Sequence, residues 1–368
     1  MKLLKVKARN FKNLANDVEI DFVAKARKTS EDKEYELQEI ADDLYVYTTM
    51  AFVGKNASGK TTALDLLFLT YNILSYFRVQ TTFSVNNVEL TIYFYYEGYI
   101  YKYDTKLVEN AIEQTVSFEN EALSRKQYYK SYSNDIYKDD FQVINYENIL
   151  PEDISVIFNV LKKKSVRVFK FDDRECNSNV YRDVFELMDI FGLDDSVLKK
   201  VIKIFDDNIH ELRRLDSGNY RIDYDGEEKD LTPKELFNLL SSGTTKGLIL
   251  YLWIIASLKA GFTIIIDEIE NHFHKTLVEN IISLYKDKSV NRNSAMLIFS
   301  THYCEILDMF NRQDNIYIAK ADRKVYLKSI YESHNVRNDI LKSKQFYNNT
   351  FKTAVNYEAL MDLKKALK

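Results

Sequence analysis

Residues 51–67 read AFVGKNASGKTTALDLL, and this stretch decides the fold of the chain. Within it, Gly54, Gly59, Lys60 and Thr61 occupy the fixed positions of the P-loop pattern G-x-x-x-x-G-K-[ST]. A hydrophobic run before the loop predicts a strand, and a Leu-rich run after it predicts a helix. Glycine suits such a loop because several backbone N–H groups must converge on one phosphate, and a Cβ would obstruct that approach. The stretch therefore predicts an α/β nucleotide-binding fold.

The loop is expected to hold the phosphates of ATP together with Mg²⁺. Lys60 would bring a positive charge to the β- and γ-phosphates, and the Thr61 hydroxyl would bind Mg²⁺. The strand is expected over residues 50–53, and the helix over 62–74 would add N–H donors and its positive dipole end. The expected nucleotide-binding residues are Gly54, Lys55, Asn56, Ala57, Ser58, Gly59, Lys60, Thr61 and Thr62. The alternative is an ordinary glycine-bearing turn.

A second run, FTIIIDE at residues 262–268, predicts a buried strand that ends in two acids. Phosphoryl transfer needs compensated charge and a positioned nucleophile. Asp267 is accordingly expected to hold Mg²⁺, and Glu268 is expected to polarise the attacking water as a catalytic residue. The alternative is a strand that merely ends in solvated carboxylates.

The segment LSSGTTKG, residues 240–247, precedes a helix predicted over about 244–260, which Gly261 would end. A serine and a glycine at a helix N-terminus make an anion-binding nest. One nucleotide cannot easily use this nest and the P-loop of the same chain, so the segment is expected to close over ATP bound to a second copy. The alternative is an ordinary N-cap, with Ser242 or Thr244 as the capping residue.

Other side chains carry weaker signals. His302 lies in FSTHYCEIL just after a hydrophobic strand, where an imidazole reaches a γ-phosphate or the water that attacks it. A lone histidine is more often structural. Glu270 and Asn271 follow the two acids directly, where a loop would cross a dimer interface.

Composition limits the function classes open to the chain. A net charge of −4 and a pI near 5.9 argue against a globally basic nucleic-acid-binding protein. The basic run LKKKSVRVFK, residues 161–170, reads as a solvated face or as a weak phosphate contact. Cys176 and Cys304 stand alone, far apart and outside any C-x-x-C, so neither a disulfide framework nor a zinc motif is indicated. Residues 1–11 lack the apolar core of a signal peptide, and the run at 248–255 is too short for a membrane span, so a cytoplasmic protein without membrane contact is expected.

The chain is expected to fold as an α/β head interrupted by an insertion. Residues 1–107 hold an N-terminal hairpin, the P-loop and an antiparallel meander from 83 to 107. Rising charge, Tyr and Asn content with helical periodicity mark 108–235 as a mostly helical insertion. Residues 236–330 complete the head with two buried strands of a parallel sheet. Residues 331–368 form a tail that packs on the head.

The order of P-loop, S-x-G signature, acidic strand and histidine resembles the head of ABC-type ATPases. The forms VGKNASGKT, LSSGT, IIIDEIENHFH and FSTHYCEIL are similar to AAA-family, OLD-like ATPases of bacterial abortive-infection systems. The likeness covers residues 1–105 and 235–320, and it reaches VRNDILKSKQFYNNTF in the tail more loosely. It implies a mixed central sheet with an antiparallel meander, Ser241 and Gly243 as the signature pair, and His302 as a second catalytic residue. It also implies a glutamine that senses the γ-phosphate, for which Gln80 is the candidate, although Gln80 could instead be a surface residue.

The resemblance further implies an ATPase sensor or regulator in anti-phage defence, whose two heads sandwich ATP and control a separate effector encoded nearby. Residues 108–235 are the expected docking surface for that effector. No toprim nuclease domain like that of OLD-type enzymes is expected after His302. The acid pairs at 139–140, 172–173 and 206–207 read as solvated faces. A RecF-like clamp that binds DNA is the alternative, followed by the ATPase subunit of a transporter, and DEIENHFH and the negative charge fit the clamp less well.

Overall fold

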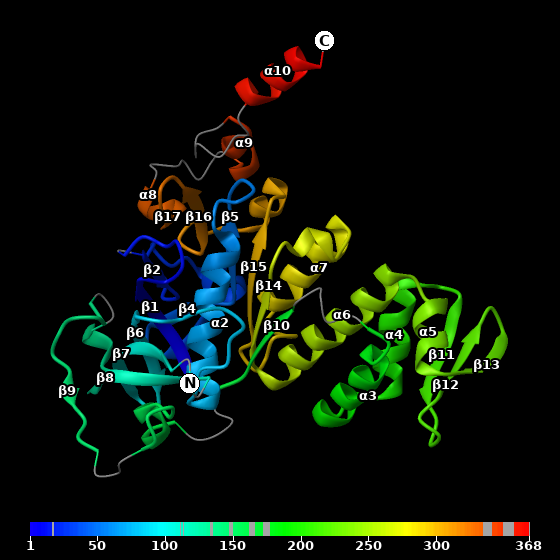
Figure 1. Ribbon diagram of the computed structural model, residues 1–368, viewed down its shortest axis with the longest axis horizontal. Coiled ribbons are helices and arrows are strands. Elements are labelled where there is room, and N and C mark those ends of the chain that lie inside the picture. The colour runs from blue at the N-terminus through cyan, green and yellow to red at the C-terminus, as the bar shows by residue number, and fades with distance from the viewer. Residues whose placement is uncertain are drawn as a thin grey trace. The chain divides into compact units, whose positions relative to one another are not determined.

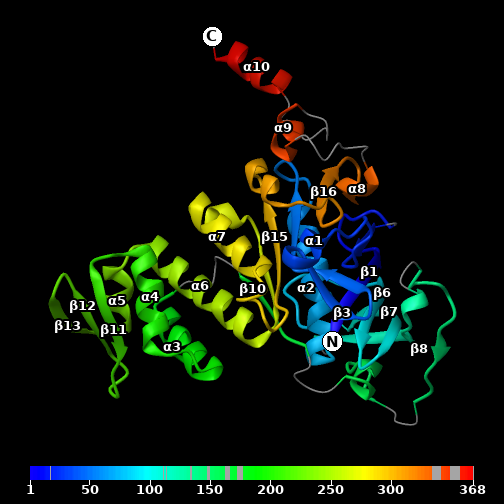
Figure 2. The ribbon, with the colours of Figure 1, turned by 180° about the vertical axis from the view of Figure 1, so that it is seen from behind.

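The computed structural model describes residues 1–368 except for 17, 111, 113, 133–134, 147–149, 162–165, 172–176, 334–340, 349–356 and 368. The chain forms two compact units (Figures 1 and 2). Unit 1 joins Met1–Val166 to Phe299–Lys368, and unit 2 is Arg167–Ile298. The features that lie outside the described residues are the acid pair 172–173, Cys176, part of the basic run at 161–170 and part of the tail segment at 336–351.

Unit 1 contains an antiparallel sheet with the strand order β2-β1-β6-β7-β8-β9. Its strands are β1 (Lys2–Arg9), β2 (Val18–Asp21), β6 (Val88–Tyr96), β7 (Tyr99–Asn110), β8 (Thr115–Gln127) and β9 (Gln142–Val143). β1 and β2 form the expected N-terminal hairpin, and β6 and β7 form the expected meander. Glu97 and Gly98 both have positive φ, as the tight two-residue turn between β6 and β7 requires.

The P-loop strand of unit 1 is β5 (Thr49–Val53), all of whose residues are buried. β16 (Ile316–Ala321) runs parallel to β5, and β17 (Val325–Ser329) is antiparallel to β16. Helix α2 (Lys60–Tyr76) follows the loop and buries most of its side chains. The strand–loop–helix order predicted over residues 50–74 is therefore confirmed, with ends that differ by one or two residues.

The remaining elements of unit 1 are short. They are α1 (Ser30–Tyr35), β3 (Leu37–Ala41), β4 (Leu44–Tyr47), α8 (Ile330–Ser333), α9 (Lys342–Tyr347) and α10 (Tyr357–Ala366). α1 begins with a capping box, in which the Thr29 hydroxyl accepts from Asp32 N and the Asp32 carboxylate accepts from Thr29 N. This box keeps a highly charged six-residue helix in place at its first turn.

Unit 2 is built around a long buried helix, α6 (Ser242–Ala260). Its other elements are β10 (Val168–Phe171), α3 (Val180–Phe191), α4 (Asp195–Phe205), β11 (Ile209–Arg214), β12 (Tyr220–Tyr224), β13 (Glu227–Leu231), α5 (Pro233–Leu239), β14 (Thr263–Ile266) and α7 (Lys275–Lys286), while β15 (Met296–Thr301) leads back into unit 1. α3 and α4 pack against α6. Gly261 ends α6 in the left-handed conformation, as predicted.

Residues 108–235 are helical only in part, which corrects the expectation of a mostly helical insertion. Besides α3 and α4, this region supplies β8 to the antiparallel sheet of unit 1, and β11 to β13 form a three-stranded sheet. β10, from the end of the basic run, pairs in parallel with β14. These strands are hard to recognise in the sequence, because strands such as β13 expose charged side chains and lack an alternation of apolar and polar residues.

Among the described residues, no single helix is both long and apolar enough to cross a membrane. α5 and α6 meet that criterion only when taken together, and they are bent by 110° where they join. The bend coincides with Leu240, the C-cap of α5, and Ser241, the N-cap of α6.

Candidate nucleotide-binding site

The loop between β5 and α2 turns sharply at the start of the helix. Ser58 N donates to Lys55 O at 3.2 Å, which folds the chain back on itself. Ala57 and Gly59 have φ values of 58° and 97°. Gly59 is the N-cap of α2, and no side chain caps the helix there. An uncapped helix N-terminus presents backbone N–H groups and a positive dipole end, which suits a phosphate.

Two glycines of the loop are dictated by the β16–β17 hairpin that packs against them. A Cβ at Gly54 would overlap the Ser58 hydroxyl and lie 2.6 Å from Ala319 O of β16. A Cβ at Gly59 would overlap a methyl group of Val325 in β17 and lie 3.0 Å from its Cβ. The hairpin is therefore a wall that fixes the path of the loop backbone, and only glycine fits at either point.

Lys60, the P-loop lysine, is only 4% exposed. Its Nζ lies 3.3 Å from Gly54 O, 3.4 Å from Lys55 O and 3.0 Å from Nε2 of His302. Lys60 and His302 are 242 residues apart in sequence. The structure thus brings the predicted histidine to the ammonium group that is expected to meet the β- and γ-phosphates.

Residues near the β1–β2 turn also contact α2, and sequence reasoning did not assign them to the site. Lys12 forms an ion pair with Asp65 of α2. Asn13 accepts a hydrogen bond from the Thr62 hydroxyl at 3.3 Å through its side chain, and from Val325 N at 2.8 Å through its carbonyl. These contacts join distant parts of the chain, so no local pattern would have revealed them.

Gln80 lies at the end of α2 that is opposite the P-loop. The helix has 17 residues and therefore spans about 25 Å. Gln80 follows its C-cap, Phe77, and is exposed, and its backbone N–H donates to the Asn72 side chain at 2.8 Å. The structure therefore does not support Gln80 as the γ-phosphate sensor.

In unit 2, the buried strand β14 ends directly before Asp267 and Glu268, as predicted. Glu268 has φ 47° and ψ 62°, a left-handed conformation that non-glycine residues adopt rarely and that recurs at active sites. Its carboxylate accepts from Asn271 Nδ2 at 2.7 Å, and Nε2 of His272 lies 3.1 Å from Asp267 O. The turn that follows β14 therefore orients the Glu268 carboxylate.

The helix N-terminus predicted near residue 244 is capped by Ser241. Its hydroxyl accepts from Thr244 N at 3.0 Å and lies 2.8 Å from the Thr244 hydroxyl. The expectation that Ser242 or Thr244 caps the helix is therefore wrong. Ser241 is the cap because its backbone is extended, whereas Ser242 already belongs to the helix. Gly243 is exposed, and among described atoms outside its own helix a Cβ there would meet only the Ser241 hydroxyl, at 3.8 Å.

Acidic side chains elsewhere are engaged in ordinary surface contacts. Asp139 pairs with Lys102 at 3.5 Å, and Asp140 pairs with Lys126 at 2.6 Å. Asp206 accepts from the backbone of Asn208. Within the part of the chain that the structure describes, no three His, Cys, Asp or Glu side chains gather closely enough to hold a metal ion by themselves. Thr61, exposed at the start of α2, and Asp267, half-buried after β14, offer the oxygen donors that Mg²⁺ prefers.

Comparisons with known proteins bear on both units. A family model described as "AAA domain, putative AbiEii toxin, Type IV TA system" matches residues 50–308, a span that runs from the P-loop past His302. Among solved structures, the chain is similar to the one titled "Crystal structure of the SmcHead bound to the C-winged helix domain of ScpA". That match has 13% identity and a TM-score of 0.49, and it covers 91% of this chain and 100% of the other. No curated protein sequence matches the chain significantly.

Proposed function

The chain belongs to the family described as "AAA domain, putative AbiEii toxin, Type IV TA system", and from this premise we propose that it is an ABC-type ATPase that regulates a separate effector in abortive infection. The contact that carries the proposal is the 3.0 Å approach of Lys60 Nζ to His302 Nε2. The P-loop lysine and the histidine of the FSTHYCEIL segment meet there, beside a helix N-terminus with no side-chain cap, and this supports a phosphate site.

ATP would be held first by the loop backbone and Lys60. The ammonium of Lys60 would exchange its contacts with Gly54 O, Lys55 O and His302 for phosphate oxygens, which are stronger, charged acceptors. His302 would then remain within reach of the same phosphate as a hydrogen-bonding group. Bound Mg²⁺ would neutralise phosphate charge, and the Thr61 hydroxyl and Asp267 carboxylate are the oxygens that fit it.

Glu268 is the proposed catalytic base. Its strained backbone and the hydrogen bond from Asn271 hold the carboxylate in one orientation, as the positioning of an attacking water requires. These roles divide the work between charge neutralisation by Lys60 and proton acceptance by Glu268.

Closure over ATP would require a second copy of the chain. Gly243 is not required by the packing around it, since a Cβ there meets only the Ser241 hydroxyl at 3.8 Å. A glycine without such a requirement leaves room for an outside group to approach the backbone. We assign that room to the phosphate end of a nucleotide bound by the other copy, with the Ser241 hydroxyl as a further contact.

The separate effector is proposed to dock on residues 108–235. Within this region, the three-stranded sheet of unit 2 exposes charged side chains that pair with one another, as Arg221 does with Asp230 at 2.7 Å. ATP-dependent closure would change which partner surfaces are accessible and so hold or release the effector. The chain alone is accordingly proposed to hydrolyse ATP without cutting nucleic acid or harming its host.

Glu268→Gln tests the ATPase and the dimer together. Turnover should fall by about 10²–10⁴ because the base is lost, while ATP still binds and accumulates unhydrolysed. Light scattering with ATP should then show more dimer or a larger assembly for the variant than for wild type. Glu279→Gln, the same chemical change on α7 where Glu279 lies 3.9 Å from Lys275, is the matched control. Equal size distributions for Glu268→Gln and wild type would count against the sandwich.

Expression of the chain without neighbouring genes tests the regulator role. Growth of the host should be unaffected, and the purified protein should leave DNA and RNA intact. Toxicity that persists in Lys60→Ala would contradict the regulator role and favour a toxin, as in the family description. DNA-stimulated hydrolysis with a steep salt dependence would favour the RecF-like clamp instead.

A further inference from the structure

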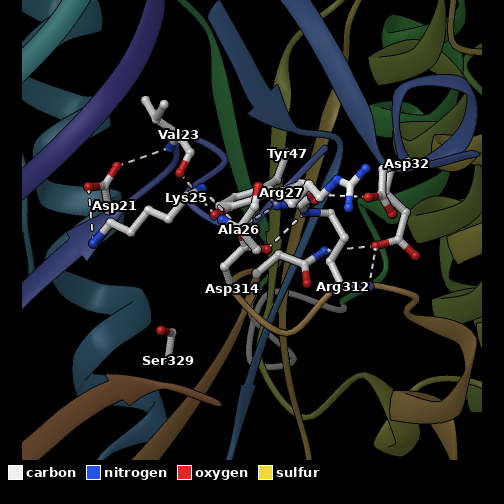
Figure 3. Close-up of polar contacts among 12 residues, drawn as sticks. Asp21, Val23, Lys25, Ala26, Arg27, Asp32, Tyr47, Arg312, Asp314 and Ser329 are labelled. Carbon is white, nitrogen blue, oxygen red and sulfur yellow. Dashed lines mark hydrogen bonds and ion pairs between the residues drawn. The ribbon is translucent and has the colours of Figure 1, made fainter. Parts of the chain in front are cut away.

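A buried ionic cluster surrounds Arg312 in unit 1, in the loop directly before β16 (Figure 3). The Arg312 side chain is 2% exposed. Its Nε and Nη2 donate to the two carboxylate oxygens of Asp314 at 2.8 Å and 2.5 Å, and its Nη1 donates to Asp32 at 3.0 Å. The guanidinium therefore makes a bidentate (two-pronged) contact with Asp314 and a single hydrogen bond with Asp32.

The same cluster holds residues 25–36, a segment we name the arm. Arg312 donates to the backbone carbonyls of Ala26 and Arg27 at 3.1 Å and 3.3 Å. In the opposite direction, the Asp314 carboxylate accepts from the backbone N–H groups of Lys25 and Ala26 at 2.9 Å and 2.8 Å. The arm is thus fixed through its backbone at Lys25, Ala26 and Arg27, in addition to the contact that the Asp32 side chain makes.

Glu36, at the other end of the arm, binds the loop that contains Arg312. It is fully buried, and its carboxylate accepts from Asn311 N at 2.6 Å and from Arg312 N at 3.2 Å. Burial alone would lower the pKa of the Arg312 guanidinium, but hydrogen bonding and charge from Asp314 outweigh it and hold that pKa above its usual value. Buried ion pairs seldom stabilise more than apolar packing does, so the value of such a cluster lies in the geometry that it specifies.

That geometry leads directly to the P-loop. Asn315, next to Asp314, donates to Thr49 O at 3.3 Å and to Glu36 at 3.4 Å, and its carbonyl accepts from Ala51 N at 3.1 Å. These contacts set the register of β16 against β5, in which Ile316 lies opposite Ala51. The other end of β16 and the start of β17 form the wall behind the two P-loop glycines.

We propose that Arg312 is a positioning residue for nucleotide binding, which it supports by fixing the start of β16 and hence the wall that shapes the P-loop. The inference rests on the proposed function, since it concerns the same nucleotide site. Arg312 lies outside the loop itself, and its effect passes through Asp314, Asn315 and the register of β16 on β5. Loss of the cluster would let the wall shift relative to Gly54 and Gly59.

The test compares Arg312→Met with Arg221→Met in the full-length chain. Arg221 forms the same two-pronged contact with one aspartate, Asp230, but on the exposed sheet of unit 2, so it controls for loss of an arginine pair. The probe is a fluorescent ADP analogue with Mg²⁺, at a temperature where circular dichroism shows both variants folded. The Kd should rise by about 5- to 100-fold for Arg312→Met and stay unchanged for Arg221→Met. KM for ATP should rise with it, while kcat at saturating ATP changes far less.

A milder pair of variants covers the case in which Arg312→Met does not fold. Asp32→Asn keeps the shape and the acceptor oxygen but removes one charge from the cluster, and Asp230→Asn is its exposed control. Asp32→Asn should weaken ADP binding in the same direction by a smaller factor. Equal ADP affinity of folded Arg312→Met and wild type overturns the inference, as does an unchanged affinity in Asp32→Asn if that is the only variant that folds. Failure of wild type to bind ADP would instead overturn the proposed function.

Discussion

The contact between Gly59 and Val325 offers a quantitative test of the P-loop wall. Gly59→Ala would place a side chain at φ 97°, a left-handed conformation that costs about 1–2 kcal/mol for a residue with a Cβ. The new methyl would also overlap the Val325 side chain, and overpacking of this kind costs about 1–3 kcal/mol. Gly59→Ala should therefore destabilise the start of α2 by about 2–5 kcal/mol.

Val325→Ala separates the two contributions. Val325 is fully buried, so its truncation alone should cost about 1.5–3 kcal/mol. In the double variant, however, the overlapping methyls are absent and only the 3.0 Å approach to the Cβ of residue 325 is left, so most of the packing part of the Gly59→Ala penalty should disappear while the backbone part stays. A double-mutant cycle should then give a favourable coupling energy of about 1–3 kcal/mol.

Hydrogen–deuterium exchange of peptides from α2 is the suitable assay, because it reports the local opening free energy of that helix. Fluorescence of the single tryptophan is the internal control, since Trp253 lies in α6 of unit 2 and should not respond. If the Gly59→Ala and Val325→Ala penalties add within about 0.5 kcal/mol, the packing of Val325 does not constrain Gly59, and the role given to the β16–β17 hairpin is wrong. Unchanged exchange in Gly59→Ala would refute the backbone geometry as well.

The other predictions concern the nucleotide site itself. Lys60→Ala should abolish stable ATP binding in equilibrium dialysis, because it removes the side-chain cation expected at the phosphates. Undiminished ATP affinity would exclude the P-loop as the nucleotide-binding site. Asp267→Ala and chelation of Mg²⁺ should cause the same loss of hydrolysis in a phosphate-release assay, and hydrolysis that survives either treatment would exclude the metal role of Asp267. Ser241→Arg should block ATP-dependent dimerisation in light scattering while the ATP affinity of the monomer stays nearly intact, since the arginine would fill the space beside Gly243, and normal dimers would exclude this surface.

Local patterns predicted the elements around the candidate site well. The P-loop strand and helix, the strand before Asp267 and the helix that Gly261 ends were each recognisable because a continuous apolar run or a special glycine marks them. The order of motifs along the chain singled out His302 as a candidate phosphate-site residue, but its contact with Lys60 was not itself predicted.

Contacts that depend on tertiary structure were not predictable in this way. The polar strand β13 shows no apolar alternation, because all but its last residue are exposed. Val325 reads as one more apolar strand residue, and only the packing of β17 on the loop shows why Gly59 must be glycine. Arg312 and Asp314 look like surface charges in sequence, yet the arm buries both.

The contact between Lys60 and His302 also determines when the site can form during synthesis of the chain. The two residues are 242 positions apart, which corresponds to roughly 12–50 s of synthesis at about 5–20 residues per second. During that interval, the nascent P-loop has neither its histidine nor the hairpin that shapes it. On the proposed function, a growing chain therefore gains a complete phosphate site only after His302 and the β16–β17 hairpin have been synthesised, and chains that stall earlier would not capture nucleotide.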